Sequence, residues 1–324
     1  MTGWLLRRTL QAAATFAVAV LLLFVLMRVS PGDPVARLAG DREMSAREIE
    51  HLRARFGLDQ PLAAQLRAFL AGLARGDLGV SIEHYPERVG ALLGARLPAT
   101  LLLGGTVLLL NFGLGVWLGV RQAVRRGSRF DRWLTRLALA GYATPAFWLG
   151  LVLVAFLSLR WHLLPAAQMT DPLLPAGAGP AARALDVLRH LALPAVTLSV
   201  TSIAVTMRHQ RAALLATFRQ DYVTAARSRG LSERRVIWGH AWPNTLVPML
   251  TLLGLWLPIL VSGSVFVEAV FNWPGLGSLA AEAISARDYP VLLGTAMLAS
   301  GAVVAAGLLA DLGYALVDPR VRPA

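Results

Sequence analysis

The chain has 324 residues, of which 56% are hydrophobic and only 15% are charged, and its formal net charge is +12. A soluble domain carries about 25% charged residues, so this chain has too little polar surface to be soluble. All 31 basic residues are arginine, and cysteine is absent. These compositional gaps exclude a P-loop lysine, a Schiff base, a disulfide framework and a thiolate metal site. We therefore predict a membrane protein.

Six stretches of at least 18 residues contain no Asp, Glu or Arg. A helix of about 20 residues crosses the roughly 30 Å of hydrocarbon in a bilayer. We predict an all-α polytopic membrane protein with six transmembrane helices, the fifth of which starts near Thr245 and is kinked at Pro248 and Pro258. A cleaved signal peptide is the weaker alternative for the first stretch. The stretches are 9–27, 97–120, 137–159, 190–207, 236–267 and 289–310.

The arginine distribution predicts the orientation. With both termini in the cytoplasm, the inside segments carry 17 arginines and four acidic residues, whereas the outside segments carry 14 of each. An excess of arginine in short inside loops is what the positive-inside rule requires. Topology thus accounts for the basic surplus, and we predict no nucleic-acid partner.

Residues 29–96, between the first two spans, are predicted to form an extracytoplasmic helical cap. Ser45 and Glu48 have the spacing of a capping box, and Gly57 can end the helix that they start. Pro61 can start a second helix. We accordingly divide the chain into residues 1–28 (cytoplasmic N-terminus and first span), 29–96 (cap) and 97–324 (core), and we expect residues 160–189 to be a loop.

The longest inside loop, residues 208–244, is predicted to contain two short helices. Residues 220–230 form a helix that Gly230 ends, and a second helix follows with Ser232 at its N-cap and Glu233 in its first turn. The two helices would make a protruding knuckle. Small side chains at Ala225 and Ala226 would let another protein approach closely. A plain basic loop is the alternative.

This loop resembles the EAA loop of binding-protein-dependent ABC importer permeases, in their peptide and nickel branch. The resemblance rests on 221–236 and 240–244, and eight further motifs agree with the family in order along almost the whole chain. The sequence departs from the broader family at two points, since Thr224 stands where the family has Glu and His240-Ala241-Trp242-Pro243 closes the loop. The further motifs are Pro31-Gly32-Asp33-Pro34, Gly57-Leu58-Asp59-Gln60-Pro61, Gly76-Asp77-Leu78-Gly79, Arg96-Leu97-Pro98-Ala99-Thr100-Leu101, Phe147-Trp148-Leu149, Pro274-Gly275-Leu276-Gly277, Arg287-Asp288-Tyr289-Pro290 and Asp318-Pro319-Arg320.

The resemblance implies a type I ABC importer permease fold in the bacterial cytoplasmic membrane. It implies a second homologous permease subunit, two ABC ATPase subunits that carry ATP and Mg²⁺, and an extracytoplasmic solute-binding protein; this chain would hold no cofactor and no catalytic residue. The cargo it implies is a peptide, with a nickel or other metal chelate, or glutathione, as the alternative. The residues expected to contact an ATPase are Asp221, Tyr222, Thr224, Ala225, Ala226, Arg227, Arg229, Gly230, Leu231, Ser232 and Glu233. In the absence of the family's Glu, Asp221 or the arginines 227 and 229 would supply the polar contacts.

Four residues are candidates for the translocation pathway: Glu268, Asn272, Pro258 and Asn111. Glu268 is the strongest, at the outer end of the fifth span, although an interfacial carboxylate held by a neighbouring backbone amide or arginine is an equal alternative. The six histidines are never within five residues of one another, so no metal site is predicted. A secondary transporter would need ionisable groups inside the bundle. Such groups are scarce here, as are the motifs of a membrane enzyme.

Overall fold

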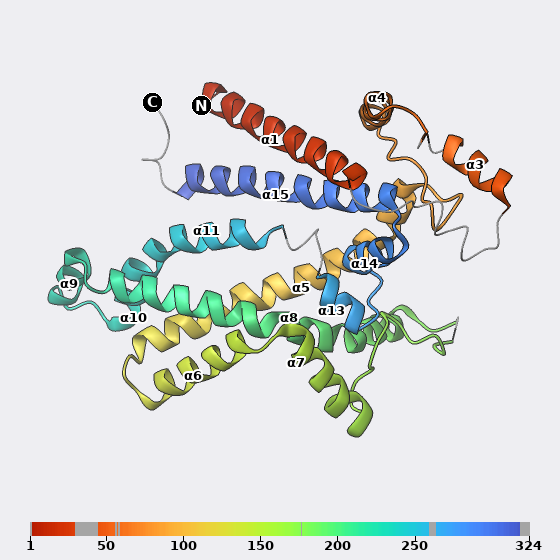
Figure 1. Cartoon of the computed structure of the whole chain (residues 1–324). Coiled ribbons are helices and arrows are strands. Elements are labelled where there is room, and N and C mark those ends of the chain that lie inside the picture. The colour runs from red at the N-terminus through yellow and green to blue at the C-terminus, as the bar shows by residue number, and fades with distance from the viewer. Residues whose placement is uncertain are drawn as a thin grey trace.

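The computed structural model describes residues 2–29, 45–55, 57, 59–175, 177–258 and 264–317. In these ranges the chain is helical, with an isolated antiparallel bridge between Val80 and Arg88. The motifs at 31–34 and 318–320, and the predicted cytoplasmic C-terminus, lie outside them. The helices in Figure 1 are α1 (Thr2–Val29), α3 (Ala46–Arg55), α4 (Leu62–Ala74), α5 (Val89–Val124), α6 (Arg129–Ala143), α7 (Ala146–Leu153), η1 (Val154–Arg160), α8 (Pro180–Thr217), α9 (Asp221–Ser228), α10 (Glu233–Arg235), η2 (Val236–Ala241), η3 (Trp242–Thr245), α11 (Leu246–Trp256), α13 (Val265–Val270), α14 (Leu276–Ala286) and α15 (Tyr289–Val317).

Four described helices, α1, α5, α8 and α15, are each long and apolar enough to cross a membrane. The third predicted span is not one straight helix, because α6 and the α7–η1 segment meet at an angle of 100°. The bend falls at Pro145, which precedes α7 and has no N–H to continue α6. If this bent pair is one span, the described residues hold five, and the count of six remains a prediction.

The fifth predicted span is also interrupted. The start of this span near Thr245 stays a prediction, because η2, η3 and α11 follow one another without a break. α11 ends at Trp256, and non-helical Ser264 precedes α13. Pro258 therefore follows the end of a helix and does not kink one. Pro248 lies in the first turn of α11, where its missing N–H is tolerated.

Two predicted loops are shorter than expected, because α8 extends beyond both ends of the fourth predicted span. It begins at Pro180, within the expected outer loop 160–189, and it continues to Thr217, within the expected inner loop 208–244. The start of α1, the end of α15, the α5–α6 connection and α9–α10 all lie at one end of the molecule (Figure 1). The predicted inside segments are thus gathered at one end.

Residues of the predicted cap form two helices, as expected. The capping box is confirmed: the Ser45 hydroxyl and amide donate to the Glu48 carboxylate at 2.7 and 2.8 Å, and the Glu48 amide donates back to the Ser45 hydroxyl at 3.4 Å. In α4, Phe69 stacks on Phe24 of α1, with ring centroids 5.4 Å apart. The following loop is held by buried Asp288, whose carboxylate accepts from the Ile82 and Glu83 amides, both at 3.1 Å.

Glycines on α5 allow it to pack closely along α8. A Cβ atom at Gly119 would lie 2.6 Å from the Met207 carbonyl oxygen and 2.8 Å from Gln210 Cβ. One at Gly115 would lie 3.0 Å from Thr206 Cβ. Only a residue without a side chain fits at these separations, as is common where membrane helices approach closely. The α5–α8 pair forms the centre of the described core.

We predict that Gly119→Ala separates α5 from α8. Its methyl group would overlap a backbone carbonyl that cannot rotate away, and overpacking of this kind costs about 1–3 kcal/mol. The thermal unfolding midpoint of the purified chain in detergent should fall. Gly113→Ala on the same helix is the control, because a Cβ there meets no atom within 4 Å. Equal midpoints for the two variants would contradict the packing argument.

Candidate coupling site

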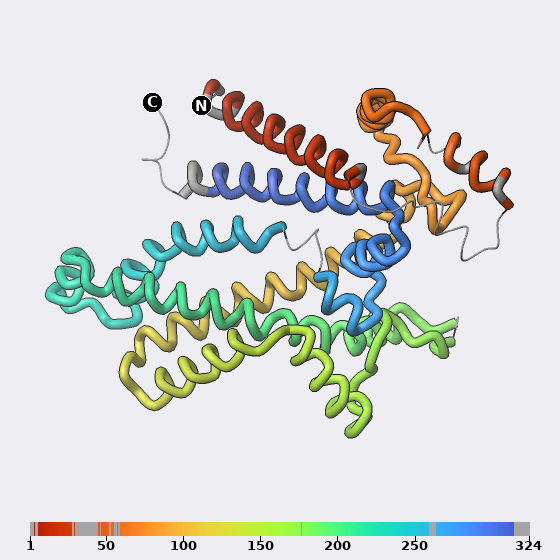
Figure 2. The backbone as a smooth tube through the Cα atoms, viewed as in Figure 1, coloured from red at the N-terminus to blue at the C-terminus, as the bar shows by residue number. Residues whose placement is uncertain are grey.

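The knuckle, defined as residues 221–235, consists of α9, the turn at Gly230 and α10. Figure 2 shows it protruding at the end of the molecule, beside the C-terminal end of α5. Its inner face is apolar and packs on the ends of two long helices. Val223 and Ala226 of α9 and Val236 after α10 join Leu214 of α8 and Val120 of α5 in one buried cluster. The knuckle is therefore anchored to α5 and α8 by hydrophobic contacts.

Gly230 ends α9 with a Schellman motif. Its φ is +76°, its amide donates to the Arg227 carbonyl at 2.9 Å, and the Leu231 amide donates to the Ala226 carbonyl at 3.4 Å. This pattern requires a left-handed residue, for which glycine is preferred. The predicted helix end and bend are confirmed. A Cβ at Gly230 would meet no atom within 4 Å, so any substitution acts on the backbone conformation and not through a clash.

The outer face of the knuckle carries most of the predicted contact residues. Asp221, Tyr222, Thr224, Ala225 and Arg229 are exposed. Partial burial of its ring raises the pKa of Tyr222, which keeps the hydroxyl protonated as a hydrogen-bond donor.

Ala226 does not fit the prediction that both alanines face a partner. It is only 6% exposed and lies in the buried cluster, because it shares a helical face with Val223, three residues earlier. Ala225 is therefore the one of this pair that can contact another protein, and Leu231 is half-buried against the same cluster.

An ion pair bridges the Gly230 turn. Arg227 Nε lies 2.8 Å from Glu233 Oε1, and the Arg227 guanidinium lies 5.4 Å from the centre of the Phe218 ring. Ser232 stands at the N-cap of α10, as predicted, but its side chain makes no capping hydrogen bond. Exposed ion pairs contribute little stability, at most about 1 kcal/mol. The pair instead orients α10 relative to α9. Because Arg227 is engaged in it, Arg229 and Asp221 are the charges more available to a partner protein.

Glu268, the leading pathway candidate, is buried within this chain. Its side chain is fully inaccessible, and its carboxylate accepts from the Ser278 amide at 3.0 Å and the Ser264 amide at 3.3 Å. Ser278 lies in the first turn of α14, so Glu268 caps that helix from another element. Gly275 makes this possible, since a Cβ there would overlap the carboxylate. In this conformation, Glu268 is a structural residue and does not line a pathway.

The other three pathway candidates lie on separate elements. Asn111 of α5 is 1% exposed, and neither polar atom of its amide has a hydrogen-bond partner within the described part of the chain. Pro258 is half-buried in the turn after α11, and Asn272 is exposed in the turn after α13, with a φ of 44°. The structure therefore does not gather the four candidates into one site.

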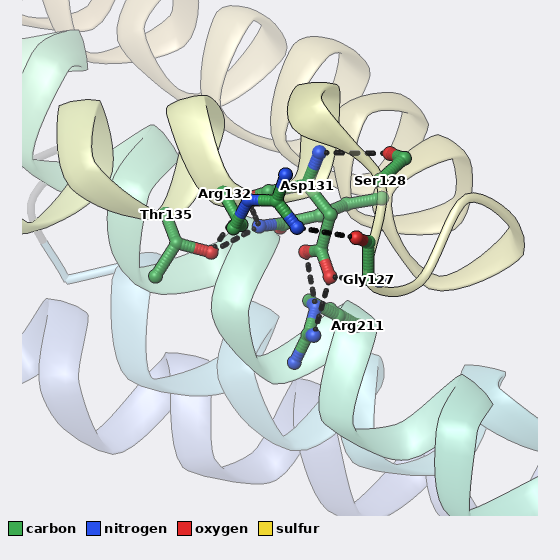
Figure 3. A network of polar contacts seen from close by, with 7 residues as sticks. Gly127, Ser128, Asp131, Arg132, Thr135 and Arg211 are labelled. Atoms are coloured by element: carbon green, nitrogen blue, oxygen red, sulfur yellow. Dashed lines mark hydrogen bonds and ion pairs between the residues drawn. The ribbon is translucent and has the colours of Figure 1, made fainter.

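A partly buried polar network braces the knuckle end of the molecule. Arg211 of α8 and Asp131 of α6 point toward each other (Figure 3), with Arg211 Nε and one terminal nitrogen 3.0 and 2.9 Å from the two Asp131 oxygens. The Gly127 amide donates to the same carboxylate at 2.9 Å. The Asp131 amide donates to the Ser128 hydroxyl at 3.2 Å, which caps α6. The network joins the α5–α6 turn to α8.

The local part of this network has a sequence signal. Ser128 and Asp131 have the Ser-x-x-Asp spacing of a helix start. Arg211 has none, because it lies 80 residues further along the chain. Burial raises the pKa of Asp131, but the hydrogen bonds and charge of Arg211, together with the Gly127 amide, outweigh that effect and hold the pKa below its ordinary value.

We predict that Asp131 makes stability depend on pH. Because its pKa is lower in the folded chain than in the unfolded chain, its contribution is complete above the unfolded value of about 4 and is lost as pH falls through the folded value. Asp131→Asn should therefore lower the thermal midpoint most at neutral pH, by the equivalent of about 1.5–3 kcal/mol for a charged hydrogen bond. The difference in thermal midpoint between the variant and the parent should disappear as pH falls below 4. Asp59→Asn, at an exposed carboxylate, is the control, and a gap for Asp131→Asn that did not depend on pH would refute the assignment.

Comparison with known proteins identifies the chain's relatives. A family described as "Binding-protein-dependent transport system inner membrane component" matches residues 92–323, and its N-terminal companion family matches residues 1–103. The chain is 35% identical to the dipeptide transport system permease protein DppB of Escherichia coli over 337 aligned residues, covering 99% of each chain. It is 35% identical to the oligopeptide transport system permease protein AppB of Bacillus subtilis, covering 99% of this chain and all of that one.

A solved structure shares the fold. The chain matches a protein in an inward-facing crystal structure of the MetNI methionine ABC transporter with a TM-score of 0.56 and 18% identity, covering 70% of this chain and 96% of that one. At this identity the likeness shows the fold, which is that of an ABC importer permease. Together with the family match over most of the chain, it shows that this protein belongs to the binding-protein-dependent transport system inner membrane components.

Proposed function

We propose that this chain is one of two membrane subunits of an ATP-driven importer of peptides. The observation that carries the proposal is the knuckle: a short helix with an exposed polar outer face, fixed by a buried apolar inner face to the ends of α5 and α8. The full-length relatives named above, which are permease proteins of dipeptide and oligopeptide transport systems, support a peptide as the cargo class.

The proposed mechanism uses the knuckle as a lever. An ATPase subunit docks on the outer face of α9, where Asp221, Thr224 and Ala225 are exposed. When ATP closes the ATPase pair, the force on α9 passes through Val223 and Ala226 to Val120 and Leu214, because those side chains are in close contact. The ends of α5 and α8 then move with the knuckle. The pathway between this chain and a second permease subunit changes from inward-open to outward-open.

The other partners follow from the same proposal. Two ATPase subunits supply ATP and Mg²⁺ sites, and a solute-binding protein delivers peptide at the end of the molecule that carries α3 and α4. This chain provides the pathway and the coupling surface but no catalytic residue. The knuckle faces the cytoplasm, as the arginine distribution predicts.

Single-cysteine labelling tests this orientation. Ala63→Cys in α4 should react with an impermeant maleimide added to intact spheroplasts, whereas Ser228→Cys and Ser232→Cys in the knuckle should react only after the membrane is opened. All three positions are exposed, and the native chain has no cysteine to give background. Labelling of Ser228→Cys from outside would reverse the topology and remove the ATPase-docking role of the knuckle.

A substitution at Gly230 tests whether the knuckle acts as the proposed lever. Gly230→Val forces a β-branched residue into the left-handed region of φ and ψ, at a cost above the roughly 1–2 kcal/mol for an ordinary residue. Relief of that strain would change the backbone angles at the turn and so change the orientation of α9. We expect the variant to insert in the membrane and to assemble, but its ATP hydrolysis should no longer be stimulated by peptide-loaded binding protein. Peptide uptake in proteoliposomes should be lost.

Two matched variants separate the conformational effect from a general defect of the loop. Gly230→Asn should retain most activity, because asparagine tolerates the left-handed region better than other side chains. Gly239→Ala should be near normal, because that glycine is not left-handed and a Cβ there makes only ordinary contact with Arg235, at 3.9 Å. Full transport by Gly230→Val would show that the bend is not part of the transmission path.

A further inference from the structure

A basic groove with aromatic walls lies between the end of α5 and the segment that follows the knuckle. It has a volume of about 400 Å³ and is lined by Trp117, Val120, Arg121, Val124, Arg125, Arg234, Ile237 and Trp238. Three arginines thus line the groove, two at the end of α5 and one on α10. Nothing in the proposed transport cycle uses them.

The three arginines of the groove are not neutralised by this chain. Among the described residues, the side chains of Arg121, Arg125 and Arg234 make no ion pair and no hydrogen bond. Arg121 stacks over the Trp117 ring at 4.0 Å, and Arg125 lies 5.6 Å from the centre of the Phe130 ring. Such stacking orients a guanidinium but leaves its N–H groups free to donate. Several free guanidiniums lining one groove fit a phosphate, which an arginine can bind in a bidentate manner.

The walls of the groove indicate where that phosphate comes from. Trp117 is 44% exposed and Trp238 is 47% exposed, and tryptophan is enriched where a membrane protein meets the headgroup layer. On α5, Leu114 shares a helical face with Trp117 and Arg121 of the groove, and its apolar side chain is 45% exposed. A ligand with a phosphate at one end and acyl chains at the other would match both parts.

We propose that this groove binds the headgroup of an anionic phospholipid such as phosphatidylglycerol or cardiolipin. The phosphate contacts Arg121 and Arg234, the glycerol region packs between Trp117 and Trp238, and the acyl chains follow α5. Basic pockets at the cytoplasmic ends of membrane helices bind such headgroups in other proteins. Because Arg121 belongs to α5 and Arg234 to the knuckle, the bound lipid would tie the two together. This last consequence rests on the proposed function.

Lipid binding to the purified full chain tests the proposal without ATPase, peptide or transport. The chain in detergent is titrated with phosphatidylglycerol, cardiolipin or phosphatidylcholine, and bound lipid is measured by native mass spectrometry. We expect the two anionic lipids to bind and phosphatidylcholine to be retained much less. Arg121→Gln and Arg234→Gln should each weaken phosphatidylglycerol binding about fivefold, the factor that corresponds to about 1 kcal/mol per basic residue.

The controls distinguish a built site from general attraction. Arg129→Gln removes the same charge from an exposed position on the same side of the molecule, outside the groove, and should bind like the parent. The proposed site would be overturned if Arg129→Gln and Arg121→Gln lost phosphatidylglycerol binding equally, or if phosphatidylcholine bound the parent chain as well as the anionic lipids do. Displacement of the lipid by millimolar inorganic phosphate or ATP would assign the groove to a free anion and overturn the lipid. The lipid-binding measurement involves neither ATP hydrolysis nor transport. A failure of the proposed coupling function would therefore leave its outcome unchanged.

Discussion

The close packing of α5 against α8 is the constraint on which the rest of the structure depends. At Gly115 and Gly119 the backbone of α5 lies directly against Thr206, Met207 and Gln210 of α8. Val120, the residue after Gly119, and Leu214, one turn beyond Gln210, belong to the surface on which the knuckle sits. A residue larger than glycine at position 119 would alter both the helix pair and the base of the knuckle, because the same contact sets the position of each.

Three kinds of interaction connect the knuckle end into one unit. Apolar packing holds α9 to α5 and α8, the Schellman motif at Gly230 sets the angle of the turn, and the Asp131–Arg211 pair ties α6 to α8. Asp221, Thr224 and Ala225 on the exposed face of α9 take no part in these three interactions. A helix that is firmly anchored on one side and free on the other is suited to receiving force from a partner. The lipid groove would add a further link between α5 and the knuckle.

What could be predicted from the sequence was mostly local. The Ser45–Glu48 capping box and the left-handed Gly230 depend on neighbours within a few residues, and both are as predicted. The orientation of Ala226 and the role of Glu268 depend on which elements fold against them, and patterns of residues do not show this. An uncharged window also cannot reveal a 100° bend at Pro145. Arg211 lies 80 residues from Asp131, so the Ser-x-x-Asp spacing that places Asp131 at a helix start does not indicate this ion pair.

In the lever mechanism, the knuckle and the adjoining end of α5 move as one body when ATP acts. Double electron–electron resonance measures the distance between two spin labels and can be applied to the assembled importer. The labels are placed at Ser228 on α9 and at Arg126 just after α5, both of which are exposed. The cysteine-free background makes the labelling specific. In complexes where ATP is shown to change the accessibility of the pathway, we expect the same distance distribution with and without ATP. A distribution that shifts with ATP would show that α9 moves independently of α5 and would contradict the lever.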